Sequence, residues 1–173
     1  MVKPLLNKAV KLVQNGNALD IGAANGYDSL FLACKGFNVT AVEKDENLSK
    51  EISDMGIEKI KVFNKDISEF NFEKYNLINC CFVLHFLQDK ARDTISKIQQ
   101  NTNSNGVNVI ITFLNEGEFD NNHEGLFKSN ELKELYSDWE VIMYAEKLVP
   151  TKEKNDDGSI KEQKTAFLLA RNN

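Results

Sequence analysis

The sequence is poor in the features that mark several protein classes. It has only three cysteines among 173 residues, with no C-x-x-C spacing. This disfavours a disulfide framework or a thiolate metal site and fits free thiols in a reducing compartment. No apolar run approaches the roughly 20 residues of a membrane span, and no apolar segment of a signal peptide follows the N-terminal lysines. We therefore expect a cytoplasmic protein with no membrane partner and no metal.

Positive charge is also scarce. The chain has 21 Lys and Arg residues against 26 Asp and Glu, a net charge of −5, and no basic cluster, which disfavours a nucleic-acid partner. A hydrophobic fraction of 42% is ordinary for a globular protein, and the length suffices for one domain with a sizeable core. We expect residues 1–173 to form a single domain with a small-molecule partner. The sequence leaves open a monomer or a homodimer.

Apolar periodicity predicts alternating helices and strands up to Phe113, which indicates a doubly wound, mostly parallel seven-stranded α/β sheet of Rossmann-like type. The last two expected strands are joined by a polar loop at 152–159 without a helix, so they should form an antiparallel C-terminal hairpin. The expected helices are 5–13, 29–33, 48–55, 90–101 and 130–136, and the expected strands are 18–21, 39–42, 60–63, 77–83, 107–113, 139–146 and 165–170.

Residues 18–26 form the most informative segment. An apolar run there ends in an acid and is followed by small residues and a helical pattern. Such a strand–loop–helix unit presents backbone N–H groups to a ligand, and small residues allow the ligand to approach the backbone closely. A dinucleotide fingerprint counted from Gly22 would need glycines where Ala24 and Tyr27 stand. This argues against a nucleotide-dependent oxidoreductase.

The observed pattern is D-x-G-x-A-x-G, which begins at Asp20 and ends at Gly26. It resembles motif I of class I S-adenosylmethionine (SAM) methyltransferases, usually written D/E-x-G-x-G-x-G. Ala24 replaces the central glycine, and we expect it to keep a negative φ, where a Cβ is tolerated. An antiparallel hairpin at the end of a parallel sheet is also the usual ending of that fold.

Later segments resemble the tellurite-resistance (TehB-type) methyltransferase family more specifically. The resembling stretches are residues 19–30, 82–87, 127–132, 139–141 and 166–171, so the resemblance covers nearly the whole chain. It implies SAM-dependent methylation, with S-adenosylhomocysteine (SAH) as product, of a small, soft acceptor such as a chalcogen oxyanion or a thiol-like compound. The alternative is a SAM- or SAH-binding protein of the same fold with little or no activity.

Carboxylates at the expected strand ends are candidates for binding SAM. Glu43 directly follows the second strand, where it can accept both ribose hydroxyls; alternatively, it belongs to a solvated turn. Asp66 follows the third strand and can reach the adenine amino group, with the Ile67 N–H near the ring; alternatively, Asp66 is a cap. Asp20 either meets the methionine ammonium or pins the loop. The expected SAM-binding set is Asp20, Gly22, Ala23, Ala24, Gly26, Ser29, Glu43, Lys44, Asp66, Ile67 and Phe82.

His85 and Phe113 follow or end strands beside the expected methyl position, so we expect them in the acceptor pocket. His85 could steer or deprotonate an acceptor, or simply pack under the next helix. The insert at 115–128 is the best candidate for a cover over the pocket, with Phe119, Leu126 and Phe127 as its apolar contacts and a solvated His123.

Residues 79–82 match the ends of the Asn-Pro-Pro-Tyr/Phe motif of amino-methyltransferases. Both prolines, which would fix the loop that aims the asparagine, are missing, so we disfavour an amine acceptor. Cys80 and Cys81 are expected to be small buried hydrophobes.

Overall fold

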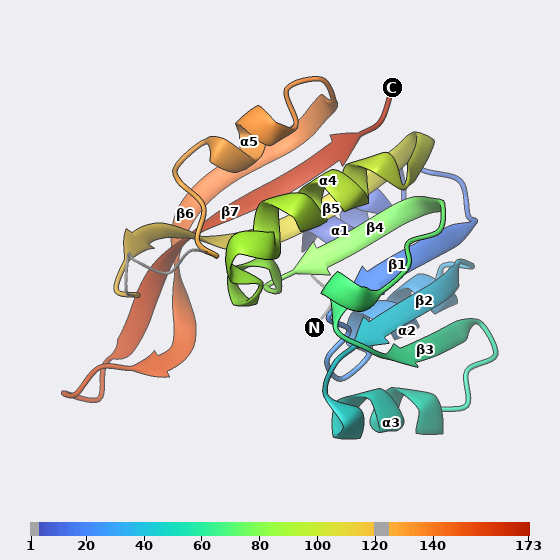
Figure 1. Cartoon of the computed structure of the whole chain (residues 1–173), viewed down its shortest axis with the longest axis horizontal. Helices are drawn as coiled ribbons and strands as arrows, with labels where there is room; N and C mark the ends of the chain where they lie inside the picture. Colours follow the sequence, from blue (N-terminus) through green and yellow to red (C-terminus); the bar gives the residue numbers. More distant parts are fainter. Residues whose placement is uncertain (1–3, 120–124) are drawn as a thin grey trace.

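The computed structural model describes residues 4–119 and 125–173. Its seven strands follow the order β3-β2-β1-β4-β5-β7-β6, with β1 to β5 parallel and β7 antiparallel to both β5 and β6 (Figure 1). The predicted doubly wound sheet with a C-terminal antiparallel hairpin is therefore confirmed. The strands are β1 Asn17–Ile21, β2 Asn38–Glu43, β3 Ile60–Asn64, β4 Tyr75–Cys81, β5 Thr102–Gly117, β6 Glu140–Lys154 and β7 Ile160–Arg171.

Helices cover both faces of the sheet, so the central strands are buried on both sides and apolar along most of their length. Leu6 of α1 and Leu32 of α2 pack in one core cluster, whereas Ile95 of α4 and Leu132 of α5 pack in another. Figure 1 shows α4 and α5 in front of the sheet and α1 and α2 behind it. The helices are α1 Pro4–Ala9, α2 Tyr27–Cys34, α3 Glu46–Asp54, α4 Ala91–Gln100 and α5 Glu131–Leu135, with short 3₁₀ turns η1 Ile67–Glu69, η2 Leu84–Phe86 and η3 Gln88–Lys90.

The first helix is shorter than its apolar stripe predicts. α1 ends at Ala9, and the chain continues in turns in which the Leu12 N–H donates to the Ala9 carbonyl at 2.9 Å. The β-branched Val10 and Val13 favour helix less than unbranched residues do. Both still pack against the core. The apolar pattern at 5–13 therefore predicts the buried residues correctly but predicts too long a helix.

The C-terminal hairpin is longer than predicted, and the loop expected at 152–159 is wrong in its first part. β6 runs on through Lys154, which pairs with Ile160 of β7, and Lys161 forms a 3.3 Å ion pair with Glu153. Only residues 155–159 form the turn, where Gly158 has a φ of +84°. Cross-strand pairing thus keeps a polar, charged segment in the ladder.

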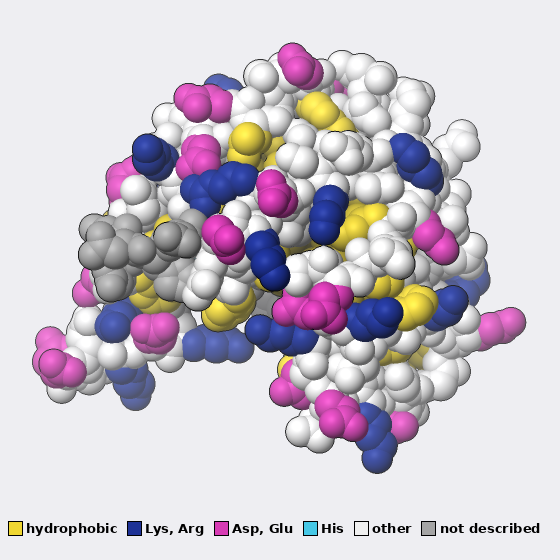
Figure 2. All heavy atoms as spheres, in the orientation of Figure 1, with side chains coloured by type: hydrophobic (Ala, Val, Ile, Leu, Met, Phe, Trp, Pro, Cys, Tyr) yellow, Lys and Arg dark blue, Asp and Glu magenta, His cyan; other side chains and the backbone are white. Residues whose placement is uncertain are grey.

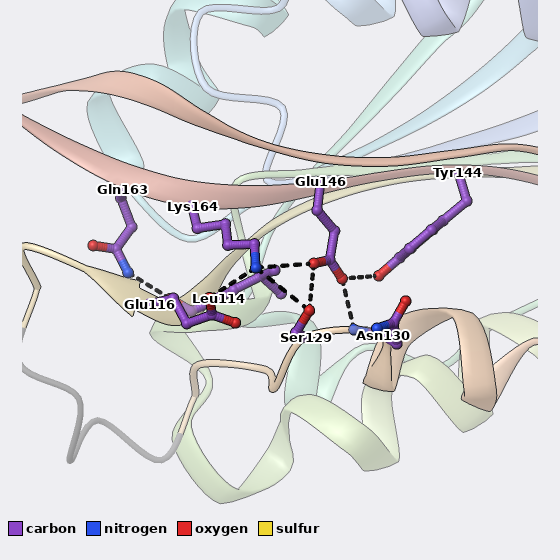
Figure 3. Close-up of polar contacts among 8 residues, drawn as sticks. All are labelled: Leu114, Glu116, Ser129, Asn130, Tyr144, Glu146, Gln163 and Lys164. Atoms are coloured by element: carbon purple, nitrogen blue, oxygen red, sulfur yellow. Dashed lines mark hydrogen bonds and ion pairs between the residues drawn. The ribbon is translucent and has the colours of Figure 1, made fainter.

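The Glu146 carboxylate joins this hairpin to the segment that precedes α5 (Figure 3). It accepts hydrogen bonds from the Ser129 hydroxyl and the Asn130 N–H, both at 2.6 Å, and from the Tyr144 hydroxyl. The Lys164 ammonium lies 3.4 Å from it. Burial disfavours the charged form of Glu146, but these donors outweigh burial and lower the pKa of Glu146 to about 2.

We predict that this network makes the hairpin acid-sensitive. The pKa of Glu146 is lowered from 4.5 to about 2 on folding, so its contribution to the free energy of unfolding is present above about pH 4.5 and is lost as the pH falls towards 2. Glu146→Gln should therefore be less stable than wild type at neutral pH and lose less stability across that interval, as measured by denaturant unfolding. Glu140→Gln, a half-exposed residue of the same strand, is the control. Parallel profiles for Glu146→Gln and wild type would contradict the prediction.

Candidate active site

A cavity of about 930 Å³ opens where the parallel strands end. Ile21, the last residue of β1, is aligned with Val42 of β2 and Cys80 of β4, so three strand ends meet at one edge of the sheet. Open α/β sheets bind ligands at this edge. The glycine loop after β1, Phe113 of β5 and the hairpin contribute to its lining.

The glycine loop bends back across the end of β2. The N–H groups of Gly22 and Ala23 donate to the Val42 carbonyl at 2.8 and 3.2 Å. Gly22 has a φ of +66°, and a Cβ placed on it would lie 2.3 Å from Cγ2 of Val83. Both the backbone conformation and the packing therefore require glycine at this position. Gly26, at φ +74°, then begins α2.

Ala24 adopts a left-handed conformation with a φ of +49°, so the expectation of a negative φ was wrong. Its N–H donates to Oε2 of Glu43 at 2.8 Å. This hydrogen bond holds the alanine in a region that costs a residue with a Cβ roughly 1–2 kcal/mol. The loop thus keeps a glycine-like backbone with an alanine in place of the central glycine.

Glu43 ties the loop to β2 rather than lying in a solvated turn. Its side chain is 7% exposed, and its second oxygen accepts the Asp45 N–H at 2.9 Å. Each carboxylate oxygen has a further lone pair, so capacity to accept hydroxyl groups remains. Glu43 contacts the loop through Ala24 but does not line the cavity.

Asp66 follows β3 and caps the turn η1. It accepts the Ser68 N–H at 2.8 Å. The hydrogen bonds from Ser68, with smaller contributions from the charges of Lys44 and Lys90, lower the pKa of Asp66. Lys44 also lies 5.9 Å from the centre of the Phe86 ring. Neither Lys44 nor Asp66, nor Ile67 beside it, lines the cavity.

A buried polar network forms the floor beneath the loop. Asp20 accepts hydrogen bonds from the Ser29 hydroxyl at 2.6 Å and from the Asn79 amide at 2.8 Å, and the same amide donates to Asp28 at 3.2 Å. The Asn79 oxygen accepts the Cys81 thiol at 3.2 Å. Asp20 thus ties β1 to α2 and β4 and also lines the cavity, so its roles in pinning the loop and in meeting the methionine ammonium both stay predictions. The Asn79 amide donates both of its N–H groups within this network.

Aromatic rings form the wall opposite the loop. Phe82 directly follows β4 with a φ of +60° and is held by a 2.7 Å hydrogen bond from its N–H to the Ile111 carbonyl. The centre of the Phe113 ring lies 5.1 Å from Phe82, 4.6 Å from His85 and 5.1 Å from Phe119. The structure thus places Phe113 beside Phe82 and His85, which lie about 30 positions earlier in the sequence. All three residues were predicted to belong to the site.

The described ends of the 115–128 insert partly match the expected cover. Phe119 and Leu126 line the cavity. Phe127 instead is buried beside Arg92, whose guanidinium lies 4.4 Å from its ring centre and is hydrogen-bonded to Glu131. The expectations for His123, and for a cover formed by residues 120–124, lie outside the described residues.

Sequence analysis missed the contribution of the hairpin. The side chain of Gln163 secures the hairpin by donating to the Leu114 carbonyl and accepting the Phe119 N–H (Figure 3 shows the first contact). The hairpin reaches the cavity because β7 pairs antiparallel with β5 and β6, and no local sequence motif indicates this position. Further lining residues not predicted are Ile21, Asn25, Tyr27, Asp28, Asn79, Cys81, Phe86, Val149, Pro150, Thr151, Lys152, Glu153 and Lys161.

The described residues show where the cysteines lie and whether a metal site or a membrane-spanning helix is present. Cys80 and Cys81 are buried and Cys34 is exposed, and burial raises the pKa of the Cys80 thiol. In the described part of the chain, no cluster of three or more His, Cys, Asp or Glu side chains is arranged to hold a metal ion. No helix within 4–119 or 125–173 has the length and apolar character needed to cross a bilayer.

We predict that Ala24→Gly raises the free energy of unfolding by up to about 1 kcal/mol, because glycine adopts a positive φ without strain. Ala23→Gly is the matched control: Ala23 is buried, has no positive φ and should lose stability when its methyl group is removed. Denaturant unfolding measures both changes. Equal destabilisation by the two substitutions would show that the conformation of Ala24 carries no strain.

Comparison with known proteins places this site in a family. The family described as tellurite resistance protein TehB matches residues 3–169. A probable S-adenosyl-L-methionine-dependent methyltransferase TehB of Haemophilus influenzae (strain 10810) is 29% identical over 172 residues, which is 94% of this chain but only 59% of that relative. This chain therefore spans about three fifths of its relative's length.

Solved structures agree with this assignment. The crystal structure of TehB from Haemophilus influenzae superposes with a TM-score of 0.88 at 26% identity, covering 99% of this chain and 63% of that one. N-methyltransferase NodS from Bradyrhizobium japonicum WM9 shares the fold, with a TM-score of 0.75 at 17% identity, covering 97% of this chain and 92% of that one. With its glycine loop, polar floor and aromatic wall, the chain belongs to the tellurite resistance protein TehB family.

Proposed function

We propose that this chain is a SAM-dependent methyltransferase that acts on a small, soft acceptor. The observation that carries the proposal is the glycine loop, whose left-handed backbone is anchored on the Val42 carbonyl and held by Glu43. This arrangement leaves the loop backbone facing a cavity at the carboxyl ends of parallel strands. The similarity to a probable S-adenosyl-L-methionine-dependent methyltransferase of Haemophilus influenzae supports the same activity.

The chemistry of the donor set fits SAM, which supplies a methyl group on a positively charged sulfur. Asp20 and Asp28 place carboxylates at the loop end of the cavity, where they suit a cationic amino group. Glu43 suits a ribose diol and Asp66 an adenine amino group, each at the end of its strand. Aromatic faces such as Phe82 stabilise a nearby cation, which suits the sulfonium.

The acceptor side fits a nucleophile that is already deprotonated, such as a chalcogen oxyanion or a thiol-like compound. Methyl transfer from a sulfonium has a good leaving group, so orientation and exclusion of water can supply most of the rate. The Phe82, Phe113 and Leu126 side chains line the wall with apolar surface that favours exclusion of water. His85 is the titratable group beside them, and we propose that it steers the acceptor.

We propose that residues 1–173 act as one methyltransferase domain in the cytoplasm, where reduced thiols are the rule. The acidic balance of the chain favours a small-molecule partner over nucleic acid. The mass of the protein in solution distinguishes a monomer from a homodimer.

We predict that Glu43→Ala weakens SAM binding by about 2 kcal/mol or more, on the order of 30-fold in Kd, because two charge-assisted hydrogen bonds to the ribose are lost. Isothermal titration calorimetry measures the change. Glu43→Gln keeps one carbonyl oxygen as an acceptor and should lie between wild type and alanine. Glu46→Ala, at an exposed position on α3, is the control. Wild-type protein that binds NADH but gives no heat with SAM would refute the proposal.

A panel of acceptors with tritiated SAM then separates a methyltransferase from a SAM-binding protein with little activity. Transfer of label to a thiol or to a chalcogen oxyanion supports the proposed reaction. SAM binding without transfer to any acceptor would favour the alternative.

A further inference from the structure

The cavity extends mainly away from the residues that suit adenosine. Glu43, Asp66 and Ile67 do not line it, whereas Phe113, Leu126 and the hairpin do. The cavity of about 930 Å³ therefore has to hold part of the cofactor at its loop end and the acceptor at its hairpin end. Pockets of roughly 300–1,000 Å³ take drug-sized organic molecules. An inorganic oxyanion of a few atoms would contact few of the side chains at the hairpin end.

The wall of the acceptor side favours a flat apolar body. Phe113 lies at the centre of a ring cluster, within 5.1 Å of Phe82, 4.6 Å of His85 and 5.1 Å of Phe119. An aromatic ring can join such a cluster in stacked or edge-to-face geometry. The ring faces themselves offer no hydrogen bonds to a strongly hydrated oxyanion, whereas they bury the faces of an apolar ring.

Charge is distributed unevenly along the cavity. Asp20 and Asp28 lie at the loop end, whereas Lys152 of β6 and Lys161 of β7 line the hairpin end. Glu153 also lines this end and pairs with Lys161 at 3.3 Å, so Lys152 is the lining cation of the hairpin for which no ion pair is recorded among the described residues. Figure 2 shows hydrophobic and cationic side chains bordering the notch beside the hairpin, at the lower left. An anionic group on the acceptor would thus be attracted to the hairpin and repelled from the loop.

We propose that the acceptor is an aromatic thiolate that carries a carboxylate. Its ring would pack on Phe82 and Phe113, and its carboxylate would face Lys152 and Lys161, which directs the sulfur towards the loop. This inference rests on the proposed function. In the transfer, the thiolate lone pair forms the new sulfur–carbon bond while the bond from the methyl carbon to the sulfonium breaks. The electron pair of the broken bond stays on the departing sulfur, and no proton moves.

Calorimetry with four probes tests the proposal. SAH is titrated first, to establish cofactor binding by itself. SAH-loaded protein is then titrated with 4-mercaptobenzoate, which has both a ring and a carboxylate. Thiophenol has only the ring, mercaptoacetate has only the carboxylate, and selenite is an inorganic oxyanion. We expect 4-mercaptobenzoate to bind at least tenfold more tightly than each of the other three, and to accept label from tritiated SAM.

Variants assign this preference to residues. Replacing Lys152 and Lys161 together by Met should reduce 4-mercaptobenzoate affinity to that of thiophenol and leave thiophenol affinity unchanged. Lys154→Met, in the same hairpin but outside the lining, is the matched control and should bind all four probes as wild type does. Phe113→Leu should weaken both aromatic probes and leave SAH affinity unchanged.

The outcomes separate this inference from the proposed function. If SAH binds but selenite binds as tightly as 4-mercaptobenzoate, or the double lysine variant keeps the preference, the acceptor inference is overturned and the methyltransferase proposal stands. If SAH does not bind, the proposed function fails, and the probes are titrated onto the unloaded protein. Equal affinity for all four probes there would overturn the acceptor inference as well.

Discussion

The site depends on the parallel register of β1 between β2 and β4. Ile21 is aligned with Val42 on one side and Cys80 on the other, so the Val42 carbonyl is placed to accept the N–H groups of Gly22 and Ala23. A shift of one residue would turn every β1 side chain to the opposite face of the sheet. Asp20 would then leave the polar floor. The register of three strands thus determines the loop, the floor and the cavity together.

Within that frame, Asn79 resolves an electrostatic conflict. Asp20 and Asp28 are both buried and lie on either side of its amide, which donates to both carboxylates. Like charges in a region of low dielectric repel strongly unless they are hydrogen-bonded. The two acids therefore require a polar residue at position 79, between the apolar Ile78 and Cys80 of β4. The resemblance of residues 79–82 to an amine-orienting motif has this structural explanation.

Local sequence patterns predicted which helices and strands form, but not the local changes that contacts with distant residues impose on them. Strand β2 and helix α4 follow directly from apolar periodicity, and the small residues around Gly22 identify the loop. The sign of φ at Ala24 was missed because it depends on the hydrogen bond to Glu43, which comes from another strand. The full length of the hairpin was not predicted, because pairing with β7 keeps the polar residues after Thr151 in strand β6.

Two left-handed residues with side chains, Ala24 and Phe82, both line the cavity. Each costs on the order of 1–3 kcal/mol and persists only where its surroundings hold it in place. The N–H of Phe82 is bound to the Ile111 carbonyl and its ring rests on Phe113, so β5 holds both the backbone and the ring of Phe82. A glycine at position 82 would release the strain but remove the ring from the wall. With phenylalanine at this position, the chain supplies an aromatic surface to the site at the cost of backbone strain.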